Sequence, residues 1–377
     1  MKNNSSFHIL LSIISSFILL SCSPSQNATE TENTVLADET TPKTEADSAI
    51  EAIEDMPAYN PNPSVHTVAF YNVENLFDTE DDPKTFDEDF TPNGKQKWTT
   101  ERYQEKIKKI AKVISMIGDK DGAEIVGLCE IENEMVLKDL VNDPLLKKHG
   151  YNYVHYDSPD ERGIDVALLY KEPVFKVTSS KNYEAKMPDR DKTRDILLVS
   201  GKLEGEEINI IVNHWSSRGG GEKESAPKRM VSALVARQIV DDLEAKNPNA
   251  KILLMGDFND EPFNESITKG LQAIESPDIK GKQLFNVFAS LEKAGKGTYN
   301  YKGDWNMLDQ IIINKGFFVA NNNAKGWRYL DGNIYEEEFL KEASGKYKGN
   351  PFRTFVGTKY LGGTSDHFPI YVHLERQ

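Results

Sequence analysis

From Val65 to the C-terminus, short apolar runs alternate with longer segments in which apolar residues recur every three or four positions. Apolar runs of this length predict strands, and the wider spacing predicts amphipathic helices. We expect strands at His66–Tyr71, Glu124–Cys129, Val166–Tyr170, Ile196–Lys202, Ile208–Val212, Lys251–Met255, Gln310–Ile313 and Pro369–Leu374, and helices at Glu101–Ile117 and Pro227–Leu243. This alternation of strands and helices predicts an α/β fold.

Acidic, amide and histidine side chains stand at the ends of several of these strands. Four of them follow a strand and two precede one; they are Asn72, Glu130, His214 and Asp257 in the first group, and Asp309 and His367 in the second. If these residues share one site, the strands must run in both directions. We therefore expect mixed or antiparallel sheets, and not the parallel sheet of a doubly wound fold.

The residue types in this set favour one kind of chemistry. Carboxylates suit a hard cation, imidazoles transfer protons, and amides orient a substrate. Together they are typical of metal-assisted attack of water on a phosphate ester.

The motifs resemble those of the endonuclease/exonuclease/phosphatase superfamily, in the same order along the chain. The resemblance covers residue 66 to the C-terminus and includes Asn72-Val73-Glu74, the Glu130 segment, Gly256-Asp257-Phe258-Asn259 and Ser365-Asp366-His367. It implies a four-layered α/β sandwich, with two packed mixed β-sheets between outer helices and the active site at one edge. Residues 65–377 would form this catalytic domain.

The resemblance also implies which residues bind a metal, Mg²⁺ or Mn²⁺. Glu130 would be the principal ligand, with Glu74 and Asp366 as further candidates, and Asn72 would border the metal and contact substrate. Glu132 is interpreted as a solvated or supporting acid.

The same resemblance implies the catalytic roles. Asp257 would orient and deprotonate the attacking water, and Asn259 would donate a hydrogen bond to the phosphate. His367 would contact the scissile phosphate, with Asp309 fixing its tautomer. His214 would act as a general acid toward the leaving oxygen or as a donor to the phosphate.

Further residues are interpreted as supporting the site or as lying away from it. Arg194 and Arg218 stand in polar loops and are interpreted as phosphate clamps, since a guanidinium offers a planar set of donors. Asp165 is a candidate to orient His214. The helix lysines, Lys106, Lys108, Lys109 and Lys112, are interpreted as a solvated face, and Ala320–Leu361 is an insertion expected to carry specificity.

The N-terminus has the features of an export signal. Lys2 precedes an apolar stretch from Ile9 to Leu20, and Leu19-Leu20-Ser21-Cys22 resembles a bacterial lipobox. Residues 1–22 are therefore interpreted as a lipoprotein signal peptide with Cys22 as the acylated residue; the alternative is a plain signal peptide with an incidental cysteine. The protein would then be exported and lipid-anchored to the bacterial cell envelope, and it is expected to act as a monomer.

Charge and cysteine usage refine this interpretation. The net charge is -15, and residues 23–64 hold nine acidic residues against Lys43 alone, so this segment is expected to be a disordered acidic tether. An acidic chain argues against a broad nucleic-acid-binding face, though a local basic groove is compatible with it. If Cys22 is lipidated, Cys129 has no disulfide partner and is interpreted as a buried apolar residue.

The leading hypothesis is an exported, metal-dependent phosphodiesterase that acts as a nuclease on DNA or RNA. One alternative is an enzyme with the same site that acts on lipid, sugar or inositol phosphates, which the acidic composition favours. A second alternative, a surface-binding lipoprotein that has lost catalysis, predicts decayed motifs, whereas these motifs are intact.

Overall fold

The computed structural model describes residues 64–118, 121–188, 191–318 and 326–376. The expected signal peptide at residues 1–22, including Cys22, and residues 23–63 of the expected tether lie outside these ranges.

Two large sheets form the centre of the described structure. The six-stranded sheet has the order β14-β17-β1-β2-β4-β3, with bounds Arg328–Ile334, Ile370–Arg376, Ser64–Leu76, Ile125–Ile131, Asp165–Lys171 and Tyr151–His155. The seven-stranded sheet has the order β5-β6-β7-β8-β13-β10-β9, with bounds Phe175–Tyr183, Ile196–Leu203, Glu206–His214, Lys251–Asp257, Asp309–Ile313, Leu284–Asn286 and Ala273–Ile274. Two small hairpins accompany them, β11–β12 (Tyr299–Tyr301 and Asp304–Asn306) and β15–β16 (Phe355–Val356 and Lys359–Tyr360).

Both large sheets are mixed, as the positions of the polar residues predicted. Strand β1 pairs parallel with β2 and antiparallel with β17. In the other sheet, β8 pairs parallel with β7 and antiparallel with β13. Strand ends from both directions therefore meet at one edge.

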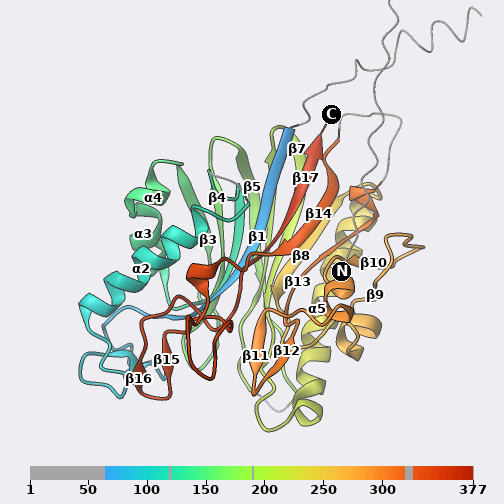
Figure 1. Cartoon of the computed structure of the whole chain (residues 1–377). Helices are drawn as coiled ribbons and strands as arrows, with labels where there is room; N and C mark the ends of the chain where they lie inside the picture. The colour runs from blue at the N-terminus through green and yellow to red at the C-terminus, as the bar shows by residue number, and fades with distance from the viewer. Residues whose placement is uncertain (1–63, 119–120, 189–190, 319–325, 377) are drawn as a thin grey trace, which may run out of the picture. The chain divides into compact units, whose positions relative to one another are not determined.

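Helices cover the outer faces of the sheets (Figure 1). Helices α2, α3 and α4 (Thr100–Ile114, Glu134–Asn142 and Pro144–Lys147) lie outside the six-stranded sheet, and α5 (Glu222–Lys246) lies outside the other. Helix α6 (Ala289–Lys293) and the short turns η1 to η4 (Glu88–Phe90, Ser266–Gly270, Lys315–Phe317 and Glu338–Leu340) occupy connections. The arrangement confirms the four-layered α/β sandwich.

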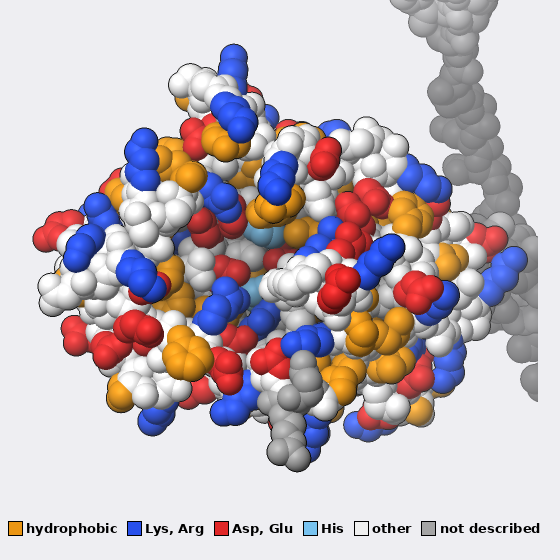
Figure 2. Space-filling model, turned by 90° about the horizontal axis from the view of Figure 1, so that it is seen from below, with side chains coloured by type: hydrophobic (Ala, Val, Ile, Leu, Met, Phe, Trp, Pro, Cys, Tyr) orange, Lys and Arg blue, Asp and Glu red, His pale blue; other side chains and the backbone are white. Residues whose placement is uncertain are grey.

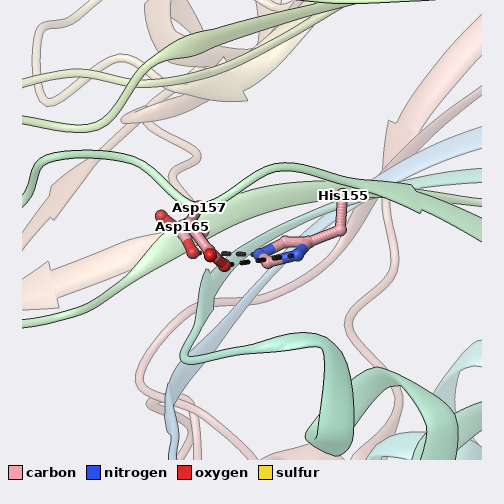
Figure 3. A group of neighbouring side chains, drawn as sticks. All are labelled: His155, Asp157 and Asp165. Carbon is pink, nitrogen blue, oxygen red and sulfur yellow. Dashed lines mark hydrogen bonds and ion pairs between the residues drawn. The ribbon is translucent and has the colours of Figure 1, made fainter. Parts of the chain in front are cut away.

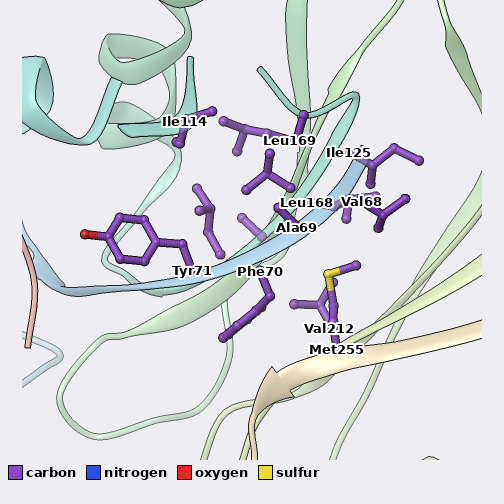
Figure 4. Close-up of a cluster of buried hydrophobic side chains, with 14 of the residues drawn as sticks. Val68, Ala69, Phe70, Tyr71, Ile114, Ile125, Leu168, Leu169, Val212 and Met255 are labelled. Atoms are coloured by element: carbon purple, nitrogen blue, oxygen red, sulfur yellow. The ribbon is translucent and has the colours of Figure 1, made fainter. Parts of the chain in front are cut away.

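The core between the sheets is formed by alternate residues of facing strands. In β1, Phe70 points toward Val212 and Met255 of the other sheet, whereas Tyr71 points to the opposite side (Figure 4). The sheets approach so closely that a Cβ on Gly127 would lie 2.3 Å from the sulfur of Met255. This contact explains why glycine interrupts the apolar run of β2.

The predicted helices are present with shifted ends. Helix α2 ends at Ile114, three residues before the predicted end, and α5 begins at Glu222, so that Pro227 lies inside the helix rather than at its start. Pro227 is therefore the sixth residue of the helix, where it lacks the N–H that would otherwise bond to the carbonyl four residues before it.

Several edge strands were not predicted. Strands β3, β5 and β14 flank the sheets, and their residues are largely polar and partly exposed. Because such strands lack a continuous apolar face, their sequence pattern is weak. Strand β14 also shows that part of the Ala320–Leu361 segment belongs to the sheet rather than to an inserted loop.

Cys129 is buried in β2 as a free thiol, in agreement with its interpretation as a buried apolar residue. No helix within the described ranges is both long enough and apolar enough to span a lipid bilayer.

Candidate active site

The predicted site residues meet at one edge of the two sheets. In the register of the seven-stranded sheet, Asp257 is paired with His214 on one side and with Asp309 on the other. Asn72 of β1 donates its amide hydrogen to Oδ2 of Asp257 at 3.1 Å, which joins the two sheets at this edge. Figure 2 views this edge and shows histidine side chains in a hollow surrounded by acidic and basic side chains.

His367 and Asp309 form a buried pair. Nδ1 of His367 lies 2.6 Å from Oδ2 of Asp309, and the hydroxyl of Thr298 donates to the same carboxylate. Burial alone would lower the pKa of His367, but the carboxylates of Asp309 and Asp257 outweigh it and raise that pKa well above its usual value. Nε2 is left facing Oδ2 of Asp257 at 3.9 Å.

Asp257 lies at the centre of the site and is 2 % exposed. Besides the bond from Asn72, its Oδ1 accepts the backbone N–H of Asn259 at 2.9 Å. Burial raises the pKa of Asp257, while the nearby His367 opposes the rise. A carboxyl group with a raised pKa is a better proton acceptor than an exposed one, which suits a general base.

His214 lies on the other side of Asp257. Its Nε2 is 3.8 Å from Oδ2 of Asp257 and 3.9 Å from Oε1 of Glu130. Burial, followed by the charge of Arg194, lowers the pKa of His214 well below its usual value, so the imidazole is neutral near pH 7. Its buried Nδ1 has no hydrogen-bond partner in the described structure.

Asp165 does not orient His214, so that interpretation was wrong. Its carboxylate bonds Nε2 of His155 at 2.9 Å (Figure 3). It also accepts the N–H of Ser158 at 2.8 Å. Asp165, His155 and the exposed Asp157 form a separate group with closely spaced potential ligand atoms. Since both oxygens of Asp165 are already bonded, this group has the character of a structural contact.

The backbone around the site is strained. Four residues have positive φ angles, a backbone conformation that residues other than glycine seldom adopt. They are Glu74 (50°), Asn75 (53°), Glu130 (64°) and Asn259 (49°). The register of β2 shifts at Glu130, and the N–H of Asn75 donates to Oε2 of Glu130 at 2.8 Å. Such strain is often found where function fixes a side chain in place.

The three predicted metal ligands lie in different surroundings. Oε2 of Glu130 accepts from Asn75, which leaves Oε1 directed toward His214. Glu74 accepts the N–H of Thr354 at 2.6 Å, and Asp366 is paired with Arg353. Burial, followed by the charge of Asp366, raises the pKa of Glu74 to about 7.

These surroundings make Glu130 the best candidate for a metal ligand. Its second oxygen is unbonded, and the neighbouring acidic side chains supply the oxygen-rich setting that Mg²⁺ or Mn²⁺ requires. Asp257, Asp309 and His367 also have ligand atoms within 4.8 Å of one another. In that group, however, Nδ1 of His367 is bonded to Asp309, so its geometry is that of a hydrogen-bonded pair.

Lys106 corrects the interpretation of the helix lysines as a solvated face. It is 1 % exposed, and its ammonium group donates to the backbone carbonyl of Glu74 and, at 2.6 Å, to Oγ1 of Thr354. Burial lowers the pKa of Lys106 to about 8, against the opposing charges of Glu74, Asp366 and Glu130. The spacing held a signal for this placement, since Lys106 lies one turn before Ile110 on the apolar face.

The two arginines interpreted as phosphate clamps lie in different environments, one buried and one partly exposed. Arg194 is 7 % exposed and donates to the carbonyls of His214 and Trp215 and, at 2.9 Å, to Asp160. Its donors are therefore engaged within the protein, and it supports the strand end that carries His214 instead of presenting a free guanidinium. Arg218 is partly exposed and donates to the backbone carbonyl of Asn259 at 2.9 Å.

Some supporting residues were missed by sequence reasoning. Thr298 bonds to Asp309, while Arg353 pairs with Asp366 and Thr354 contacts both Glu74 and Lys106. None of these belongs to a recognisable motif. Their roles can be recognised only from contacts between segments that are distant in the sequence.

The sequence profile described as "Endonuclease/Exonuclease/phosphatase family" matches residues 67–376. The chain belongs to this family. The family comprises phosphodiesterases, nucleases and phosphatases, so the protein is placed among hydrolases that act on phosphate esters. Its members use divalent metals, and the acidic and histidine side chains at this edge could bind one.

Solved structures agree with the fold of the family. A family protein from Bacteroides thetaiotaomicron is 18 % identical, with a TM-score of 0.50 over 84 % of this chain and 99 % of that one. TDP2 from C. elegans is 13 % identical, with a TM-score of 0.53 over 88 % of this chain and 81 % of that one. D. rerio TDP2 complexed with a single-strand DNA product is also 13 % identical, with a TM-score of 0.50 over 82 % and 99 %. No protein of curated function matches the sequence.

Proposed function

We propose that this family member is a metal-dependent phosphodiesterase that hydrolyses nucleic acid. The observation that carries the proposal is the convergence of His214, the His367–Asp309 pair and Asp257 at one buried edge. This set can accept a proton from water and donate hydrogen bonds to a phosphate, and Asp309 keeps His367 oriented.

In the proposed reaction, water attacks phosphorus and the bond to one ester oxygen breaks. Asp257 accepts the proton of the attacking water, for which its buried position and two fixed hydrogen bonds are suited. His367, held by Asp309, donates from Nε2 to a phosphate oxygen. His214 and Asn259 donate further hydrogen bonds to the phosphate. The departing ester oxygen takes a proton from solvent water, and Asp257 later returns the proton it accepted to solvent.

Glu130 is the residue we propose to hold the metal, with Glu74 and Asp366 adding negative charge nearby. When bound, Mg²⁺ or Mn²⁺ polarises a phosphate oxygen and offsets the charge that develops on it. The fit rests on the unbonded oxygen of Glu130 and on the acidic side chains around it.

A nucleic-acid substrate is supported by the structural neighbour that was solved with a single-strand DNA product. The net charge of -15 favours the alternative, a phosphodiesterase or phosphatase acting on lipid, sugar or inositol phosphates, because nucleases gain affinity from cations. The two observations therefore favour different classes of substrate.

We also propose that the protein is exported and anchored to the cell envelope through lipid on Cys22. The lipobox-like sequence ending at Cys22 supports this, as does the acidic, aromatic-poor composition of residues 23–64. Metabolic labelling with a fatty acid would test it, because Cys22→Ser should abolish incorporation.

The decisive experiment measures cleavage of plasmid DNA, both native and heat-denatured to single strands, by the full chain in Mg²⁺, in EDTA and with Asp257→Ala. We expect cleavage only by the unaltered protein in Mg²⁺. The exposed Asp278, whose side chain is 83 % accessible, provides a control: Asp278→Ala should cleave like the wild type. Activity retained by Asp257→Ala would refute the assignment of the base, and release from a small phosphodiester without DNA cleavage would favour the alternative substrates.

A further inference from the structure

A pocket of about 460 Å³ adjoins the catalytic histidine. Tyr299 forms part of its wall, and the Tyr299 ring lies against the imidazole of His367 with centroids 4.9 Å apart. Asp366, the residue before His367, lines it as well. A ligand in the pocket would therefore be next to the phosphate that His367 contacts.

Two segments that are distant in sequence build the pocket. One is the β11–β12 hairpin, and the other is the segment 342–356, which belongs to the region expected to carry specificity. The side chain of Asn350 donates to Asn300 at 3.2 Å, which connects the two walls, while Arg353 pairs with Asp366 at the inner end. The two segments are thus connected by contacts between residues that line the pocket.

The lining of the pocket is unusually aromatic for an exposed surface. Tyr301 and Tyr347 are 54 % and 47 % exposed, and Trp305 is 36 % exposed while stacking on Phe368. Exposed aromatic side chains gathered around one concavity indicate a binding site for a flat or apolar group.

The charges at the pocket differ from those of the whole chain. Three cations, Lys302, Lys346 and Arg353, face two acids, Glu342 and Asp366. The ammonium groups of Lys302 and Lys346 lie 4.9 Å and 5.3 Å from the centroids of the Tyr301 and Tyr347 rings. Cations thus lie next to exposed aromatic rings at this pocket, although the chain as a whole has a net charge of -15.

We propose that this pocket binds one unpaired nucleobase of the nucleotide next to the scissile phosphate, and that the substrate is single-stranded nucleic acid. Aromatic rings stack on any base because every base has a π-face, and the lysines would contact the adjoining phosphates. A paired and stacked base does not expose that face, so a duplex must first unstack. This inference rests on the proposed phosphodiesterase function and adds the form of its substrate.

The test compares three substrates with the full chain: a single-stranded oligonucleotide, the same length of strand with abasic central positions, and the corresponding duplex. We expect kcat/KM to be highest on the single strand. Tyr301→Ala and Tyr347→Ala should each lower kcat/KM on the single strand by about 5- to 150-fold, the value of one lost base stack. On the abasic strand the same variants should match the wild type, because no base is present to stack.

Two further variants separate stacking from folding. Tyr347→Phe keeps the ring and should retain wild-type kcat/KM. Leu330 of β14 is 45 % exposed, similar to the two tyrosines, but does not line the pocket. Leu330→Ala should therefore leave kcat/KM unchanged on all three substrates.

The outcomes distinguish this inference from the proposed function. If the wild type cleaves the single strand and the tyrosine variants lose no more than Leu330→Ala, the base pocket is refuted and the phosphodiesterase remains. The base pocket is also refuted if the variants lose as much on the abasic strand, since the pocket would then bind a sugar or phosphate. A wild type that cleaves none of the three refutes both.

Discussion

His367 and Asp309 are joined by a 2.6 Å contact across 58 residues of sequence, and the pair faces Asp257 from the neighbouring strand. The contact fixes the tautomer of the imidazole, because Nδ1 must carry the proton that Asp309 accepts. The free Nε2 is then the atom available to a substrate phosphate.

Replacing Asp309 with Asn should therefore reduce turnover without preventing folding. We expect Asp309→Asn to lower kcat by about 10²- to 10⁴-fold, since the amide no longer enforces the tautomer or stabilises the imidazolium. Steady-state kinetics on a phosphodiester would measure the effect. Because both residues act as one unit, the double variant Asp309→Asn/His367→Gln should have a kcat only slightly lower than that of His367→Gln alone. Additive losses would show that the two residues act independently.

The position of Glu130 leads to a prediction about metal binding. We expect EDTA to abolish activity and Glu130→Gln to raise the Mg²⁺ concentration needed for half-maximal activity by about 10- to 100-fold, since a neutral amide is a weaker ligand. The shift of the melting temperature with added Mg²⁺ or Mn²⁺ gives a second readout that does not depend on turnover. Glu134→Gln, an exposed change on the neighbouring helix, is the control. An unchanged metal dependence in Glu130→Gln would place the metal elsewhere.

Lys106 and Lys108 are neighbours in α2 but lie in opposite environments, one buried and one exposed. Lys106→Met should lower the free energy of unfolding by about 3–5 kcal/mol, because it leaves a carbonyl, a hydroxyl and the carboxylate of Glu74 without their cation. Lys108→Met should change it by less than about 0.5 kcal/mol. Urea denaturation of both variants measures the difference, and equal stabilities would show that the buried contact of Lys106 contributes nothing.

Much of this site could be predicted because its residues follow strong apolar strands. Asn72, Glu130, His214 and Asp257 stand where the hydrophobic pattern ends, and the opposed position of Asp309 correctly predicted mixed sheets. Strand periodicity and the order of the motifs are local properties of the sequence, so they can be recognised without a structure.

The remaining features depend on contacts between distant segments. The burial of Lys106 arises because Thr354, 248 residues away, packs against α2. Arg194 was interpreted as a phosphate clamp because a polar loop surrounds it, whereas the fold directs its guanidinium to Asp160 and to the carbonyl of His214. A charged side chain in a polar sequence has the same appearance whether it is buried or exposed, since its partners are supplied by other parts of the chain.

Glu132 leads to a prediction about stability and pH. Its carboxylate accepts the N–H of Asp78, and burial, together with the charges of Asp78 and Asp87, raises the pKa of Glu132 to about 8 from 4.5. The folded protein therefore holds a proton that the unfolded chain releases above pH 4.5. For this group, the free energy of unfolding falls as the pH rises from about 4.5 to about 8.

Glu132→Gln should remove this fall in the free energy of unfolding, because the amide resembles the protonated carboxyl and its oxygen still accepts the N–H of Asp78. We expect the variant to be more stable than the wild type by about 1–3 kcal/mol at pH 8 and to show no gain near pH 4, where the wild-type side chain is neutral in both states. Urea titrations at a series of pH values would measure this, with the exposed Glu134→Gln as a control that should show no such trend. A variant that is destabilised equally at every pH would contradict the raised pKa of Glu132, because the difference in stability would then not depend on protonation.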